Sequence, residues 1–181
     1  MKALKALHIL IPMTLIAAAP GLAPAVDDDD DDDDGRVRAE LSGVNENPIV
    51  LSAGNGTFRA RLRGDSIRFT LDYEDLAGPG SDVTQAHIHV GNPWDNGGVA
   101  VFLCSNLGNT PGNVTFRACP PSPGRVEGRI VAGDVLPASP LGVGDLEGLK
   151  QLLTGGAAYI NVHSDRVPAG EIRGQTNPRR R

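Results

Sequence analysis

The fold class is indicated by residues 57–73, which read TFRARLRGDSIRFTLDY. Apolar residues alternate with arginines before the Gly64-Asp65 pair, and they alternate with polar residues after it. A period of two is the pattern of a β-strand that buries one face. The Gly64-Asp65 pair suits the tight turn of a hairpin. The segment therefore predicts two antiparallel strands that pack on a common core.

Short alternating runs of this kind recur along the chain between turn signals, and 23 glycines and 14 prolines supply the turns. This spacing is typical of β-sandwiches and barrels. We expect an all-β, antiparallel β-sandwich or barrel-like fold of about eight strands, immunoglobulin-like or Cu/Zn superoxide dismutase-like. The further strand candidates are residues 36–42, 83–90, 98–104, 125–133, 157–163 and 171–175.

One segment, residues 143–156, departs from the strand pattern because its leucines recur at helical spacing. Asp145 is placed to cap the start of a helix, and the Gly155-Gly156 pair is placed to end it. We therefore expect one short helix near residues 145–154, packed on an end or a face of the sheet.

The N-terminus has the features of a secretory signal peptide over residues 1–25. A short basic start precedes the apolar run ILIPMTLIAAA, and Ala23-Pro24-Ala25 has the small-x-small pattern of a cleavage site. The apolar run is short for a membrane span, and nothing later in the sequence reads as a transmembrane helix. We expect a protein that is secreted or periplasmic after cleavage near Ala25 and that begins near Val26.

The negative charge of the chain is concentrated in residues 26–35, which contain eight consecutive aspartates, Asp27 to Asp34. Such a run repels itself and buries no apolar surface, so we expect a disordered leader. Loss of the two lysines within residues 1–25 leaves 15 basic against 22 acidic groups, a net charge of −7. When the eight aspartates are also left out, the rest of the chain has 15 basic against 14 acidic groups, a net charge of +1. The remaining residues 36–176 suit a single, nearly neutral domain. The basic tail, residues 177–181, is too short to indicate nucleic-acid binding.

The chain has two cysteines, Cys104 and Cys119. In an exported protein a disulfide between them is the expectation, because the oxidising compartment favours the bond. A thiol metal ligand or nucleophile is the less favoured alternative.

The histidines form the most distinctive pattern. His87 and His89 are one residue apart in the predicted strand 83–90, so both rings point to its polar face. His163 lies on the polar face of the predicted strand 157–163. If these two strands are neighbours, three imidazoles meet on one face of the sheet.

Two interpretations of the histidines remain open. Together with Glu171 on the following strand, His87, His89 and His163 would suit Zn²⁺ or Cu²⁺, and the Irving–Williams order favours copper. Alternatively, each neutral ring offers one donor and one acceptor with which to hold a neighbouring loop. Glu46 is expected to have a structural role, accepting backbone N–H bonds or pairing with an arginine such as Arg173.

At this point the motifs resemble a known family, the CHRD domain, which is named for its occurrence in the extracellular developmental protein chordin and is found in many exported bacterial proteins. The similar segments are LSGVNENP (41–48), AHIHVG (86–91), NGGVAVFLC (96–104) and the long stretch at 144–175. The resemblance covers residues 36–176. It implies an extracellular β-rich domain of poorly defined biochemical activity.

AHIHVG is also similar, more distantly, to the copper-binding strand of Cu/Zn superoxide dismutases. Those enzymes use four copper-binding histidines and a separate zinc set, whereas this chain has three histidines after residue 25. We therefore do not expect a dismutase.

The resulting expectation is an exported, non-catalytic CHRD-domain protein, a binding or structural module of undefined ligand. No Gly-x-Ser-x-Gly motif, reduced-cysteine site or Gly-rich phosphate loop indicates an enzyme. The alternative is a periplasmic or extracellular copper- or zinc-binding protein that uses His87, His89 and His163, and a hydrolase or redox enzyme on the same site is a third reading. The expected partner is an extracellular protein, a glycan or a metal ion, with no nucleic acid and no membrane span.

Overall fold

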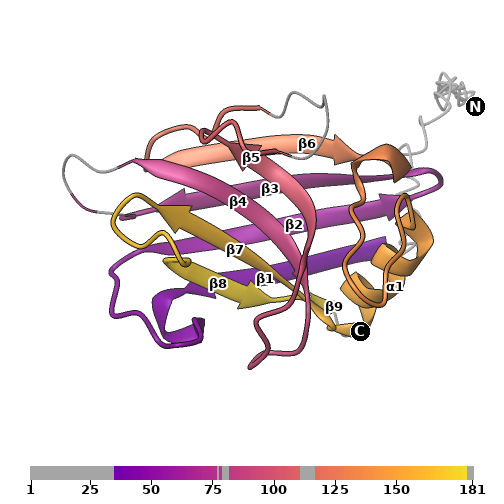
Figure 1. Cartoon of the computed structure of the whole chain (residues 1–181), viewed down its shortest axis with the longest axis horizontal. Coiled ribbons are helices and arrows are strands. Elements are labelled where there is room, and N and C mark those ends of the chain that lie inside the picture. The colour runs from indigo at the N-terminus through magenta and orange to yellow at the C-terminus, as the bar shows by residue number, and fades with distance from the viewer. Residues whose placement is uncertain (1–34, 77, 79–81, 111–116, 179–181) are drawn as a thin grey trace, which may run out of the picture. The chain divides into compact units, whose positions relative to one another are not determined.

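The computed structural model describes residues 35–76, 78, 82–110 and 117–178, and these form an antiparallel sheet curved into a nearly closed barrel (Figure 1). The order along the sheet is β5-β4-β7-β8-β1-β2-β3-β6, and the short β9 pairs with β1 beside β8. The expected signal peptide and aspartate leader, and the last three residues of the basic tail, lie outside the described residues. The strands are β1 (Arg36–Ser42), β2 (Asn55–Arg63), β3 (Ser66–Glu74), β4 (Val83–Val90), β5 (Val99–Ser105), β6 (Gly124–Ile130), β7 (Ala158–Ser164), β8 (Ile172–Gln175) and β9 (Asn177–Pro178).

The hairpin predicted from residues 57–73 is confirmed, with Arg63 opposite Ser66 on either side of the turn. Gly64 has a φ of +47°, a left-handed conformation that favours glycine. The alternation sends the apolar side chains of both strands inward and the arginines outward. Each of the eight main strands contributes to one continuous core, which is why a single sheet curves around it.

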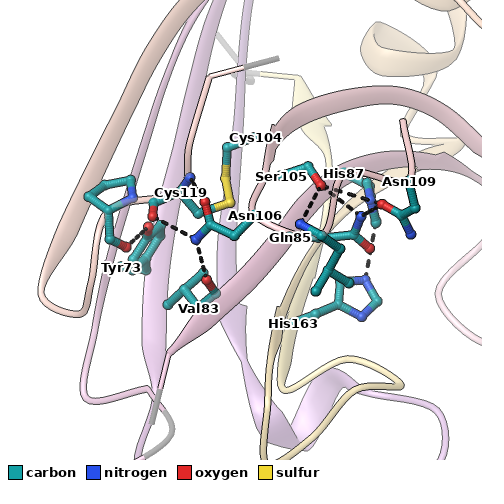
Figure 2. The surroundings of a disulfide bond; sticks show 12 residues. Tyr73, Val83, Gln85, His87, Cys104, Ser105, Asn106, Asn109, Cys119 and His163 are labelled. Atoms are coloured by element: carbon teal, nitrogen blue, oxygen red, sulfur yellow. Dashed lines mark hydrogen bonds between the residues drawn. A yellow bond between two sulfur atoms is a disulfide. The ribbon is translucent and has the colours of Figure 1, made fainter. Parts of the chain in front are cut away.

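The two ends of the sheet, β5 and β6, are held together by a covalent bond. The predicted disulfide joins Cys104 at the end of β5 to Cys119 in the segment that leads to β6 (Figure 2). Beside it, the Asn106 side chain donates to the carbonyl oxygens of Val83 and Cys119 and accepts from the Cys119 amide. The disulfide and these hydrogen bonds therefore connect the two edge strands, β5 and β6, at the seam of the barrel, which is the place where the order of paired strands begins and ends.

The predicted helix is present as α1 (Leu146–Gly155), at one end of the sheet (Figure 1). Asp145 accepts a hydrogen bond from the Gly148 amide at 2.9 Å, as an N-cap does. Gly156 ends the helix with a φ of +71°. The apolar side of α1 is buried in the core through Leu146, Leu149 and Leu153.

One predicted boundary was wrong. The strand expected over residues 125–133 ends at Ile130, because Ala132–Asp134 form the 3-10 turn η3. The Asp134 carboxylate accepts from the Val131 amide and stabilises this turn. A second 3-10 turn, η2 (Gly43–Asn45), follows β1. Within the described part of the chain, no helix has the length and apolar character needed to cross a lipid bilayer.

Candidate metal centre

The strand register brings the three histidines together. β4 pairs with β7, so the predicted neighbourhood of these strands is confirmed. His87 lies opposite Asn161 of β7, which in turn lies opposite Arg173 of β8. His163 lies opposite Gln85, two residues before His87. All of these side chains are on the face of the sheet that points away from the core.

This polar face is covered by loops and shielded from solvent. His87 and Arg173 are each only 4% exposed. The loop of residues 91–98 packs over the face, where its Gly97 amide donates to the Tyr159 hydroxyl and its Asp95 carbonyl accepts from Arg173. Because the face is buried, each polar group on it needs a partner.

Two of the rings are oriented by backbone carbonyl oxygens. His89 Nδ1 lies 2.9 Å from the Gly97 oxygen, and His163 Nδ1 lies 2.9 Å from the Pro168 oxygen. A carbonyl oxygen only accepts, so both Nδ1 atoms carry the proton and both Nε2 atoms carry a lone pair. Metal-binding histidines commonly have this arrangement, in which an outer hydrogen bond fixes the tautomer.

The third ring, His87, contacts both other rings. Its Nδ1 lies 3.2 Å from His163 Nε2, and its ring centroid is 5.5 Å from that of His89. The Nε2 atoms of His87 and His89 are buried and have no hydrogen-bond partner in the described structure. Such orphaned acceptors are costly in a folded protein, and their presence calls for an explanation such as a bound ion.

One nitrogen from each of the three rings lies within 4.8 Å of the others. Zinc–nitrogen bonds of about 2.0–2.1 Å place tetrahedral ligands about 3.4 Å apart, so small ring rotations would complete a site. The two interpretations drawn from the sequence are therefore compatible. His89 and His163 each hold a loop through Nδ1 and leave Nε2 to the cluster. The Nε2 of His89 has no partner in the described residues, and that of His163 lies 3.2 Å from His87 Nδ1.

Burial keeps the three rings neutral. Burial, together with the smaller effects of the neighbouring His163 and His89, lowers the pKa of His87 to about 3. Burial also lowers the pKa of His89, to about 4, against the raising effect of the Gly97 hydrogen bond. The pKa of His163 is lowered for the same main reason. Neutral imidazole is the form that binds metal, so the rings do not need to lose a proton near pH 7.

Glu171, the fourth residue suggested by the sequence, does not belong to this group. Its carboxylate is buried and accepts hydrogen bonds from the hydroxyls of Ser52 and Ser164. It thereby joins the loop before β2 to the end of β7. The structure thus brings together the three histidines and gives Glu171 a different set of contacts.

Glu46 forms a buried ion pair with Arg173, as the sequence suggested, with Oε2 and Nε 2.8 Å apart. Asn161 donates to its other oxygen. Burial raises the pKa of Glu46 more than Arg173 and the hydrogen bonds lower it. Arg173 also donates to the Asn96 side chain, so the pair links β8 to two loops.

Tyr159 is a neighbour of the site that the sequence did not single out. Its ring stacks on His89 with centroids 4.8 Å apart and an interplanar angle of 4°, and Arg173 lies over the tyrosine ring at 4.4 Å. The sequence signal that could have identified Tyr159 was its position on the same strand face as His163. Tyr159 therefore connects the ion pair to the histidines and fixes the plane of the His89 ring.

Residues 37–176 match the family model of the CHRD domain. This chain belongs to the CHRD-domain family. The match confirms the resemblance noted in the sequence, and the CHRD domain here contains the three histidines, the ion pair and the disulfide. Neither curated proteins nor solved structures give a significant match to the chain.

Proposed function

We propose that this chain is an exported CHRD-domain protein that binds one copper or zinc ion through His87, His89 and His163. The observation that carries the proposal is the set of converging ring nitrogens, together with the buried Nε2 atoms of His87 and His89, which have no partner in the described residues. A bound cation would satisfy these lone pairs. It would also explain why three neutral rings are packed together on a covered face.

The ligand set narrows the choice of metal. Three neutral imidazoles suit zinc and copper, whereas calcium and magnesium prefer oxygen ligands. The Irving–Williams order favours Cu²⁺ over Zn²⁺ at such a site. We therefore expect copper to bind more tightly when both ions are supplied.

Binding without catalysis is the role that the surroundings support. Metal-assisted hydrolysis needs an open coordination position and usually an acid or base beside it. The buried carboxylates near the rings have other contacts: Glu46 pairs with Arg173, and Glu171 accepts from two serines. Asp95 accepts from the amide and side chain of Asn92.

Export is supported by two separate features. The first 25 residues have the pattern of a cleavable signal, and the disulfide between Cys104 and Cys119 suits an oxidising compartment. The first residue of protein recovered from the periplasm or the medium, expected near Val26, tests this part of the proposal.

The second candidate is a non-catalytic structural module in which the histidines only hold loops. The hydrogen bonds from His89 to Gly97 and from His163 to Pro168 favour it. It predicts that no metal binds with defined stoichiometry.

The deciding experiment is a calorimetric titration of untagged, chelator-treated protein with Cu²⁺ and with Zn²⁺. We expect one ion per chain, and a loss of at least about tenfold in affinity for each of His87→Gln, His89→Gln and His163→Gln, because each change removes a ligand. Electron paramagnetic resonance of the copper-bound protein detects the ligand atoms directly, and its spectrum should show coupling to imidazole nitrogens.

Two variants serve as controls. Deletion of Asp27 to Asp34 removes the acidic run that could bind cations weakly, and Glu171→Gln removes the carboxylate that the structure separates from the site. Both should retain stoichiometric binding. Binding that is lost with the aspartates, or a copper spectrum without nitrogen coupling, would leave the histidines with a structural role.

A further inference from the structure

A row of arginines crosses the outer face of the sheet, away from the histidines. Arg36 of β1 lies opposite Arg61 of β2, which lies opposite Arg68 of β3, which lies opposite Arg129 of β6. Directly opposed residues on neighbouring strands point to the same side of the sheet. The side chains are exposed, except that of Arg36, which is partly buried. The barrel thus presents a line of four guanidinium groups.

The row of arginines lowers the stability of the folded protein. Like charges in directly opposed positions of a sheet are destabilising. Arg129 is paired with Asp65, but Arg36, Arg61 and Arg68 form no ion pair within the described residues. On the same face, Arg38, Arg59 and Arg125 have carboxylate partners. Three unneutralised guanidinium groups in register therefore need a reason other than stability.

The three unpaired arginines line a groove of about 1170 Å³ that also contains Trp94. The Trp94 side chain is 75% exposed, although its backbone is held in place. Asn47 donates to the Trp94 carbonyl at 2.7 Å, and Arg173 donates to the carbonyl of the next residue. A flat aromatic face is thus displayed at a defined position in a basic groove.

We propose that this groove binds a polysaccharide whose sugars carry carboxylate groups. The guanidinium group binds carboxylates in a planar, two-bonded geometry. The face of Trp94 is a surface for the apolar side of a sugar ring, and the amides of Asn45 and Asn177 in the same groove can bond to hydroxyls. The proposal concerns residues outside the metal centre and does not depend on a bound ion.

Two features favour a carboxylated glycan over other polyanions. The other three arginines that line the groove are each paired with a carboxylate, so three guanidinium groups remain unpaired within the described residues, which suits one charge per sugar rather than a densely charged polymer. Single-stranded nucleic acids stack successive bases on several aromatic side chains. In the described chain, Trp94 is the one exposed aromatic residue of this groove.

The test uses the fact that Trp94 is the single tryptophan of the chain. Tryptophan fluorescence of the full-length mature protein would be followed during titration with oligogalacturonate at low and at physiological salt. We expect a saturable change that weakens as salt rises. The double variant Arg61→Gln/Arg68→Gln should bind at least tenfold more weakly while its melting temperature stays equal or rises, because a like-charge contact has been removed.

Arg63→Gln is the matched control. Arg63 is exposed, has no ion pair in the described structure and does not line the groove, so this change should leave the affinity within twofold. Equal binding by the Arg61→Gln/Arg68→Gln variant would overturn the proposal. So would equal or tighter binding of a neutral dextran, heparin, poly-glutamate or single-stranded DNA.

Discussion

At the scale of single residues, the buried ion pair between Glu46 and Arg173 connects several groups around the site. Glu46 comes from the segment after η2 and Arg173 from β8, and together they contact Asn161, Asn96 and the ring of Tyr159. Removing one member of a buried pair leaves an uncompensated charge. The pair therefore matters more for local order than its Coulomb attraction alone would indicate.

We expect Glu46→Ala to lower the free energy of unfolding by about 3–5 kcal/mol, because it leaves the Arg173 guanidinium buried without its carboxylate. The double variant Glu46→Ala/Arg173→Met should cost less than the sum of the two single changes. Urea unfolding of the three variants measures this coupling. Additive losses would mean that the two side chains act independently.

At the scale of elements, pairing of β4 with β7 produces the histidine cluster. Each strand places its histidines on the outer face by simple alternation, and the ladder brings the faces together. The covering loops then remove the rings from water, which lowers all three pKa values.

This burial predicts an acid dependence of stability for the metal-free protein. The unfolded rings titrate near pH 6.5, whereas the folded pKa values of His87 and His89 are about 3 and 4. The unfolded chain thus binds more protons below pH 6.5, so the contribution of the neutral rings is complete above that pH and is lost as the pH falls toward 4. Each ring adds a slope of up to about 1.4 kcal/mol per pH unit.

Urea unfolding between pH 7 and pH 5, in the presence of chelator, measures this slope. The window lies above the titration range of ordinary carboxylates. The control is His89→Gln, which should show a smaller slope because one titrating ring is absent. Nuclear magnetic resonance signals of His87 and His89 that titrate near pH 6.5 would contradict the prediction.

At the scale of the whole molecule, the barrel is closed by a disulfide. All eight main strands share one core, but β5 and β6 at the ends of the sheet are joined by Cys104, Cys119 and the hydrogen bonds of Asn106. A crosslink over a sequence separation of 15 residues restricts the unfolded chain as well as the native seam.

We expect replacement of Cys104 and Cys119 by serine to lower the free energy of unfolding by about 3 kcal/mol, chiefly through the greater entropy of the unfolded chain. Urea unfolding measures the loss. Reductant should destabilise the natural protein by a similar amount and leave the serine variant unchanged. Equal stability of the two proteins would show that the hydrogen bonds at the seam suffice.

Much of the fold could be predicted because strand alternation and helix capping are local. The hairpin at Gly64-Asp65, the helix with its cap at Asp145, and the outer placement of His87, His89 and His163 all follow from residues close in sequence. The end of β6 could not be predicted, since the 3-10 turn after Ile130 depends on one side-chain contact of Asp134.

The sequence by itself determined the all-β class, the family, the disulfide and the three histidines as a group, because each depends on residue type and short-range period. Only the tertiary structure decided that Glu171 bonds to serines while the rings keep buried, unpartnered nitrogens. It alone also placed four arginines from four strands in one row, three of which line a groove with Trp94. The physical reason is that burial, register and loop cover arise between segments far apart in the chain.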